Sequence, residues 1–323
     1  MGMLGSEFVQ RYSRSSPGTW EQAALDEARL GSLTPWPLVP ITLTDGNDTA
    51  VLGVQSDVLA IGSIADFVRI PLTPAYAQSI LNLSGSLLPT PWLEYRIWQS
   101  AEAKLTPISM VPNQGASLEQ YAKHSQLIDI ALARQNIWPG TLVAGVKKGV
   151  VVANFYKPGK VLLFGWYRRF LTKDGALTDT LAPDVFDDGK PIGTENRQPI
   201  QPRSNVHAEG YVDYSHGIRL VAPTCQVNGE TWETVKLYQH PTLSRLVNPL
   251  AANANAPSQA GALFMPRYPA PVPPAAPMRI ASGGTLGPAA IDTVQRPAGR
   301  IPFTPDPTEI ALDTLAAQRN RRS

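Results

Sequence analysis

Residues 141–170 read TLVAGVKKGVVVANFYKPGKVLLFGWYRRF, and this stretch decides the fold class. Two runs rich in β-branched and aromatic residues, 141–156 and 160–170, stand on either side of Lys157-Pro158-Gly159. Proline and glycine between two such runs indicate a tight turn between antiparallel strands. The stretch therefore predicts a β-hairpin in the second half of the chain.

The residues before this hairpin carry mainly helix signals. Four helix starts combine a capping hydroxyl with a proline or with a glutamine three residues later: Thr19–Gln22, Thr73-Pro74, Thr90-Pro91 and Ser117–Gln120. Between the first two, three prolines in LTPWPLVPITL (33–43) predict an extended crossing. The segment VLGVQSDVLAIG (51–62) predicts a strand pair or a bulged strand.

The residues after the hairpin continue the β pattern. A polar loop, 171–205, leads to the strand-like YVDYSHGIRLV (211–221), and Asn228-Gly229 is a typical tip of a further hairpin. Helices followed by antiparallel strands give the order of an α+β fold, whereas a doubly wound fold alternates strand and helix. We therefore expect N-terminal helices packed on a mainly antiparallel sheet.

The composition changes near residue 250. Residues 251–307 hold twelve of the 31 prolines and neither lysine nor tryptophan. Such a segment favours polyproline II and cannot bury a core of its own. We expect a globular α+β domain over 1–250, an extended arm rich in proline and alanine over 251–305, and a short helix with a basic end over 306–323.

Charge and cysteine content limit the classes of function. The formal net charge is only +2, so no overall field favours nucleic acid as a partner. There is one cysteine, and the four histidines lack metal-ligand spacing, so we expect neither disulfide, metal nor other cofactor. No signal peptide or membrane-spanning run is visible, which predicts a protein that is cytoplasmic at synthesis. Later incorporation into a virion or similar particle is left open by the sequence.

The segment 211–221 contains the candidate site. If it is fully extended, Asp213 and Ser215 share one face, whereas His216 points to the opposite face. A Ser-His-Asp relay needs its imidazole between acid and hydroxyl, so the base would have to be His207 or another residue across the cleft. Lys148 could stabilise an oxyanion across the cleft. On the same face, Asp213 is the expected ion-pair partner of Arg219.

The alternative interpretation makes the same residues architectural. Asp213 then binds backbone amides of a turn or bulge at Ser215-His216-Gly217. Lys147 and Lys148 then protect an edge strand from aggregation. Cys225 is then an ordinary cysteine in a short loop, since no helix N-terminus precedes it.

Five stretches resemble a poorly characterised group of bacterial and phage-encoded proteins, over residues 55–222. They are SDVLAIGSIADFVRIPLTPAYAQ (56–78), LPTPWLEYRIWQSAEAKL (88–105), AGVKKGVVV (144–152), FGWYRR (164–169) and YVDYSHGIRLV. Members often carry His at the position of Val146, Asp at that of Gly149 and His at that of Tyr167. The resemblance implies a degenerate hydrolase-like domain, which has lost polar side chains around a cleft, and it transfers no reaction.

Two functions of different classes remain. The first is a structural protein of a multi-subunit, phage virion-like particle, in which the C-terminal arm binds other protein subunits. The second is an active hydrolase of an amide or glycan bond of the cell-wall type, with Asp213, Ser215, His207 and Lys148 around its cleft.

Overall fold

The computed structural model describes residues 2–110, 117–154, 157–168, 170–171, 176–178, 180–181 and 199–249. All of them belong to one unit of the chain, Met1–Gly283. The proline-rich arm and the C-terminal helix expected from the sequence lie outside the described residues.

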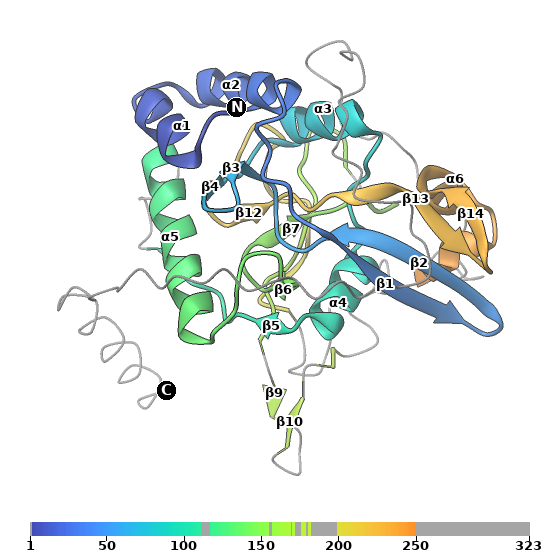
Figure 1. Cartoon of the computed structure of the whole chain (residues 1–323). Coiled ribbons are helices and arrows are strands. Elements are labelled where there is room, and N and C mark those ends of the chain that lie inside the picture. The colour runs from blue at the N-terminus through green and yellow to red at the C-terminus, as the bar shows by residue number, and fades with distance from the viewer. Residues whose placement is uncertain are drawn as a thin grey trace. The chain divides into compact units, whose positions relative to one another are not determined.

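Helices and strands are both well represented (Figure 1). The helices are α1 (Gly5–Tyr12), α2 (Pro17–Arg29), α3 (Pro74–Ser84), α4 (Pro91–Ser100), α5 (Leu118–Arg134), α6 (Thr234–Gln239) and the 3-10 helix η2 (Leu243–Leu246). The strands of the N-terminal half are β1 (Leu38–Asp45), β2 (Asp48–Gln55), β3 (Ala60–Ser63), β4 (Asp66–Arg69), β5 (Ala103–Lys104) and β6 (Val143–Ala144). The later strands are β7 (Lys148–Val150), β8 (Leu163–Gly165), β9 (Phe170–Leu171), β10 (Leu177–Thr178), β11 (Gln201–Ser204), β12 (His216–Gly217), β13 (Val221–Val227) and β14 (Glu230–Glu233).

Two four-stranded sheets form the framework. The first has the order β1-β2-β13-β14 and is antiparallel throughout. The second has the order β11-β8-β7-β12, and only its β7–β12 pair is parallel. This arrangement confirms the α+β class with mainly antiparallel pairing.

Several expected turns and helix starts are present. Strands β7 and β8 pair antiparallel, and the expected Lys157-Pro158-Gly159 turn lies in the connection between them. Asn228 and Gly229 both have positive φ, 50° and 86°, as the two-residue hairpin between β13 and β14 requires. The hydroxyl of Thr90 accepts a hydrogen bond from the Leu93 amide at 3.0 Å, so α4 begins with the expected cap.

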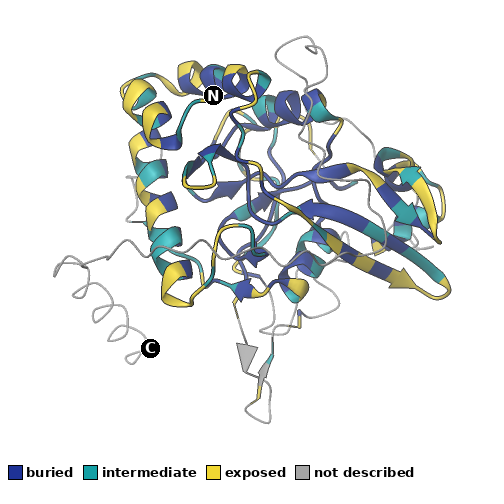
Figure 2. Cartoon of the chain, in the orientation of Figure 1, coloured by how far each residue is buried: buried dark blue, intermediate teal, exposed yellow. Residues whose placement is uncertain are grey.

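The helices lie around the sheets and cover a continuous apolar core (Figures 1 and 2). α5 is tied to β4 by Arg69, whose guanidinium is almost fully buried. Its Nη2 lies 2.7 Å from Asp57 and its Nη1 lies 2.6 Å from Asp129 of α5. A second, smaller apolar cluster under α5 includes Val58 and Val146. These contacts join α5 to β4 and to the segment from β6 to Val146.

Candidate functional site

The segment 213–216 is a hydrogen-bonded turn. The Asp213 Oδ1 atom accepts hydrogen bonds from both the amide and the hydroxyl of Ser215, at 2.8 and 2.5 Å. Its Oδ2 accepts a hydrogen bond from the Tyr211 hydroxyl at 2.9 Å. The His216 amide donates to the Asp213 carbonyl at 3.2 Å and closes the turn. Asp213 thus binds a local backbone amide, as the turn interpretation expected, but the turn spans residues 213–216, and His216–Gly217, which were expected in the turn, form strand β12.

The turn changes where His216 points. The expectation that His216 faces away from Asp213 is wrong, since the alternation of side chains holds only for extended backbone. The ring Nε2 lies 4.0 Å from Asp213 Oδ1, and the side chain is fully buried. Neither ring nitrogen has a hydrogen-bond partner among the described residues. Burial lowers the pKa of His216 to about 4, although the carboxylate of Asp213 acts in the opposite direction.

The carboxylate of Asp213 is held in its charged form. Burial alone would raise its pKa, but the neighbouring His216 and the hydrogen bonds from Ser215 and Tyr211 together lower it. Both carboxylate oxygens are already engaged within the segment Tyr211–Ser215. The Ser215 hydroxyl is buried and donates its proton to Asp213, so no histidine receives it.

His207, the expected base, has a different neighbour. Its ring stacks on that of Tyr211, with ring centres 4.5 Å apart and planes 17° apart. Its ring centre lies 6.4 Å from that of His216. Within the described part of the chain, His207 makes no hydrogen bond to Ser215 or Asp213. The structure therefore brings Asp213, Ser215 and His216 together. It places the His207 ring against that of Tyr211, without a hydrogen bond to Asp213 or Ser215.

Lys147 is buried and Lys148 is half-buried. β7 lies between β8 and β12, so the interpretation of Lys147 and Lys148 as guards of an edge strand is wrong. Lys148 is paired in register with His216, and its ammonium lies 4.9 Å from the centre of the Trp166 ring. Burial lowers the pKa of Lys148, although Asp213 raises it. The Lys148 ammonium thus lies next to the turn and makes a cation–π contact with the Trp166 ring.

Lys147 belongs to a buried chain of hydrogen bonds. Its ammonium donates to the carbonyl of Tyr214 and to His124 Nδ1, the latter at 3.0 Å. His124 Nε2 in turn lies 2.9 Å from the Ile108 carbonyl, an arrangement that requires the Nε2-protonated neutral ring. Burial is the main reason that the pKa of Lys147 falls to about 7. This series of hydrogen bonds joins α5 to the turn at residues 213–216.

Arg219 does not pair with Asp213. Its guanidinium is buried and donates to the carbonyls of Gln55 and Val143, the latter at 2.7 Å. The expected ion pair is therefore wrong, because the turn directs Asp213 toward Tyr211 and Ser215. The carboxylate whose pKa Arg219 lowers is that of Glu94, while burial acts more strongly to raise it. Glu94, which lies in the first turn of α4, was not singled out by the sequence analysis.

Two of the three positions singled out by the resemblance lie around Glu94. A Cβ atom on Gly149 would sit 2.8 Å from Glu94 Oε1. Tyr167 is buried, its hydroxyl has no partner among the described residues, and burial together with Glu94 raises its pKa. Val146 instead packs in the small apolar cluster under α5. The carboxylate of Glu94 thus occupies space that any side chain at position 149 would need.

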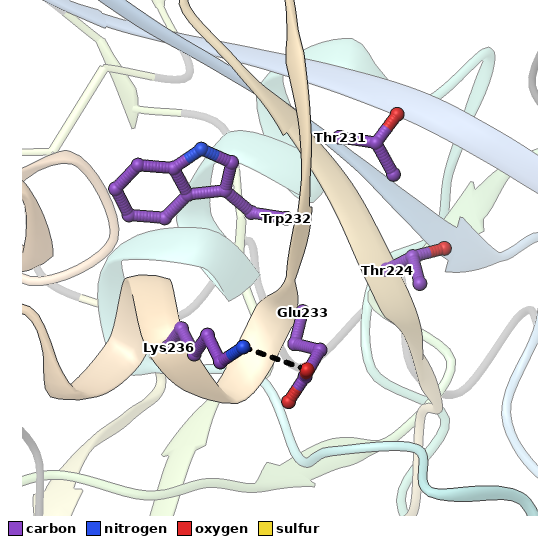
Figure 3. Close-up of a pocket in the computed structure, with 5 residues that line it drawn as sticks. All are labelled: Thr224, Thr231, Trp232, Glu233 and Lys236. Carbon is purple, nitrogen blue, oxygen red and sulfur yellow. Dashed lines mark hydrogen bonds and ion pairs between the residues drawn. The ribbon is translucent and has the colours of Figure 1, made fainter.

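A separate hollow lies on the first sheet (Figure 3). It has a volume of about 390 Å³ and is lined by Thr224, Thr231, Trp232, Glu233 and Lys236. Lys236 is engaged by Glu233 at 2.8 Å, and Figure 3 shows the Trp232 ring on the opposite side of β14 from Thr231. The hollow is therefore lined by one exposed ion pair, two threonines and the Trp232 side chain.

Cys225 lies in strand β13, and not in the loop expected from the sequence. Its side chain faces the core, and burial raises the pKa of the thiol, which disfavours a reactive thiolate. Within the described ranges, no three His, Cys, Asp or Glu side chains gather closely enough to hold a metal ion. No helix in those ranges has the length and apolar character needed to cross a membrane.

The fold is of the α+β class, and the polar side chains of the turn, Tyr211, Asp213 and Ser215, bond to one another. Compared with protein-family models, with curated proteins and with solved structures, the chain matches none of them.

Proposed function

We propose that this chain is a non-enzymatic subunit of a multi-subunit assembly. Residues 1–250 form its scaffold, and the proline-rich arm, 251–305, contacts neighbouring subunits. A virion-like particle is the kind of assembly that we favour. The localisation that follows is synthesis in the cytoplasm and later incorporation into the particle.

The observation that carries the proposal is that both oxygens of the Asp213 carboxylate are engaged in local hydrogen bonds. Its carboxylate accepts three hydrogen bonds from Tyr211 and Ser215. Protonation of this carboxylate, as general-base chemistry requires, would weaken all three bonds. The polar residues of the turn thus stabilise the path of the chain into β12, which is the property of a scaffold.

The composition of the arm supports the second half of the proposal. A segment with many prolines, no lysine and no tryptophan loses little conformational entropy when it binds in an extended form. Such a segment is suited to lie along the surface of another subunit. It contributes no core that would compete with that contact.

The test is size-exclusion chromatography with light scattering on the full chain and on a truncation that ends at residue 250. We expect the full chain to have a mass several times 34.9 kDa and the truncation to be a monomer. A full chain that stays monomeric at all accessible concentrations would refute the proposal. Equal oligomers of both chains would show that the arm is not the contact.

The second candidate is an active hydrolase of an amide or glycan bond, and one observation favours it. His216 and Lys148 lie beside Asp213, and both nitrogens of the buried His216 ring lack partners in the described structure. Buried, unpaired titratable groups are more common at active sites than elsewhere. In that reading Ser215 attacks the substrate, Asp213 takes its proton, Lys148 stabilises the oxyanion and His207 lies at the entrance.

A serine-directed phosphonate separates the two candidates. We expect no mass adduct on the peptide 211–221, because the Ser215 hydroxyl is buried and bound to Asp213. Stoichiometric labelling of Ser215 that is abolished by Asp213→Asn or by His207→Ala would favour the hydrolase instead.

A further inference from the structure

Two distant segments that carry exposed apolar side chains pack together beside the start of β1. Trp138 and Leu38 are 52% and 48% exposed. Trp138 opens a turn that the Thr141 amide closes at 3.2 Å. Within this turn, a Cβ atom on Gly140 would lie 3.5 Å from Pro37 Cγ, so the turn packs against the residue before Leu38.

We call this surface the Trp138 patch. Its members are Pro35, Pro37, Leu38, Trp138 and Pro139, all of them exposed. Figure 2 shows further exposed residues along β1, which is the outer strand of the first sheet. An exposed indole among prolines is a surface that proline-rich segments recognise, because their rings pack flat against it. Large apolar side chains gathered at the surface commonly mark an interaction site.

The chain itself carries a segment of the matching chemistry. The stretch PRYPAPVPPAAP (266–277) is half proline. It favours the polyproline II conformation that aromatic surfaces bind, and its only charge is that of Arg267. No second proline-rich stretch of this density occurs in the sequence.

The geometry of the chain allows this stretch to leave its own scaffold. The described residues end at Pro249, shortly after η2, where Arg245 pairs with Asp45 and Asp48. These two aspartates lie at the end of the β1–β2 hairpin away from Leu38. Residues 250–265 span up to about 50 Å when extended, whereas eight-residue β1 is about 26 Å long. The linker is thus long enough for the stretch to reach either the Leu38 end of its own hairpin or a neighbouring copy.

We propose that the Trp138 patch binds the stretch 266–277 of a neighbouring copy of this chain. The inference rests on the proposed function and specifies the surface and the segment that make the contact. Trp138 is the anchor of this contact, because large aromatic side chains dominate the affinity of small interfaces. The prolines of the patch widen the apolar surface on either side of the indole.

The first experiment measures association of the full chain by light scattering over a range of concentrations. We expect Trp138→Ala to raise the concentration of half-association at least tenfold, and the triple change Pro271→Ala, Pro273→Ala and Pro274→Ala to do the same. The matched control is Leu30→Ala, which removes an apolar side chain that is 75% exposed outside the patch, and we expect no change. Unaltered circular dichroism of each variant shows that its fold is kept.

The second experiment identifies the partner directly. A photoreactive phenylalanine analogue replaces Trp138, and chains of ordinary and ¹⁵N-labelled isotope composition are mixed before irradiation. We expect cross-links from position 138 to residues 266–277, with both mixed-isotope combinations present. Cross-links only within one chain would overturn the inference.

The outcomes separate this inference from the proposed function. Association of the wild-type chain that Trp138→Ala leaves unchanged would overturn the inference and leave the assembly function standing. A wild-type chain that does not associate would refute the assembly function, and the inference with it.

Discussion

Buried charges in this protein are held by backbone carbonyls and by neighbouring side chains. Arg219 donates to two carbonyls, and its charge opposes the rise that burial causes in the pKa of Glu94. We expect Arg219→Met to lower the free energy of unfolding by about 3 kcal/mol, because it leaves two buried acceptors and a carboxylate without their partner. Urea denaturation measures this loss.

The control for Arg219 is an exposed ion pair. Lys236→Met removes the partner of Glu233, and both side chains are more than half exposed. We expect this change to cost less than about 1 kcal/mol. Equal losses for the two variants would contradict the role assigned to Arg219.

Lys147 gives the stability a pH dependence. Its folded pKa is lowered to about 7, whereas an unfolded lysine titrates near 10.5. Between these values the unfolded chain binds the proton and the folded chain does not, so stability rises as pH increases and is lost as pH falls toward 7. We expect the free energy of unfolding to rise between pH 7 and 8.5 by at most about 1.4 kcal/mol per pH unit. Thermal unfolding at a series of pH values measures this rise as a higher midpoint temperature.

The variant Lys147→Met isolates this effect. Methionine keeps most of the length of the side chain and has no proton to exchange. We expect the rise in stability between pH 7 and 8.5 to be much smaller in this variant than in the wild type. A variant with the same slope as the wild type would assign the pH dependence to other groups, such as Lys148, whose pKa is also lowered.

At this scale the sequence predicted which residues gather but not how they are bonded. Asp213 and Ser215 are neighbours, as expected, because they are two residues apart. The positions of His216 and Arg219 were wrong, because a single turn between 213 and 216 reverses the faces assumed for an extended strand. Glu94 could not be found at all, since its contact with Gly149 joins parts of the chain 55 residues apart.

Among the elements, the short parallel pair β7–β12 depends on a glycine. A Cβ atom on Gly217 would lie 2.6 Å from Lys147 Cβ and 3.0 Å from Val58 Cγ1. The first of these neighbours is fixed to the backbone, so the two strands would have to separate. We expect Gly217→Ala to destabilise the fold by about 1–3 kcal/mol, as overpacking usually does.

A second glycine of the same segment provides the control. Gly210 has no atom within 4 Å of its Cβ position, and its φ lies outside the left-handed region. We expect Gly210→Ala to be neutral or to stabilise by up to about 1 kcal/mol, because it reduces the freedom of the unfolded chain. Differential scanning calorimetry of both variants decides the point, and a neutral Gly217→Ala would contradict the close approach of β7 and β12.

Most elements with local signals were predictable, although α2 begins at Pro17 after Ser16 and not at the capping box expected at Thr19–Gln22. The caps at Thr90 and Ser117 and the turn at Asn228-Gly229 depend on side chains within four residues of one another. The pairing of β13 with β2 and of β12 with β7 depends on contacts across most of the chain. Helix α1 begins after Leu4 without a hydroxyl cap, which explains why no start signal marked it.

For the whole molecule, the composition changes near residue 250, and both apolar clusters of the described part are built from residues before that position. We expect a 1–250 truncation to unfold in one cooperative transition, with the same urea slope by fluorescence and by circular dichroism. A broad or two-step transition would show that the scaffold needs residues beyond 250.

The central claim is that residues after 250 hold copies of the scaffold together, and adding them back to the truncation tests it most directly. The polypeptide 251–323 is titrated into the 1–250 truncation by isothermal calorimetry. We predict saturable binding near one to one, with an affinity at least tenfold lower when the truncation carries Trp138→Ala. No heat of binding at any concentration, while the full chain associates under the same conditions, would contradict the claim.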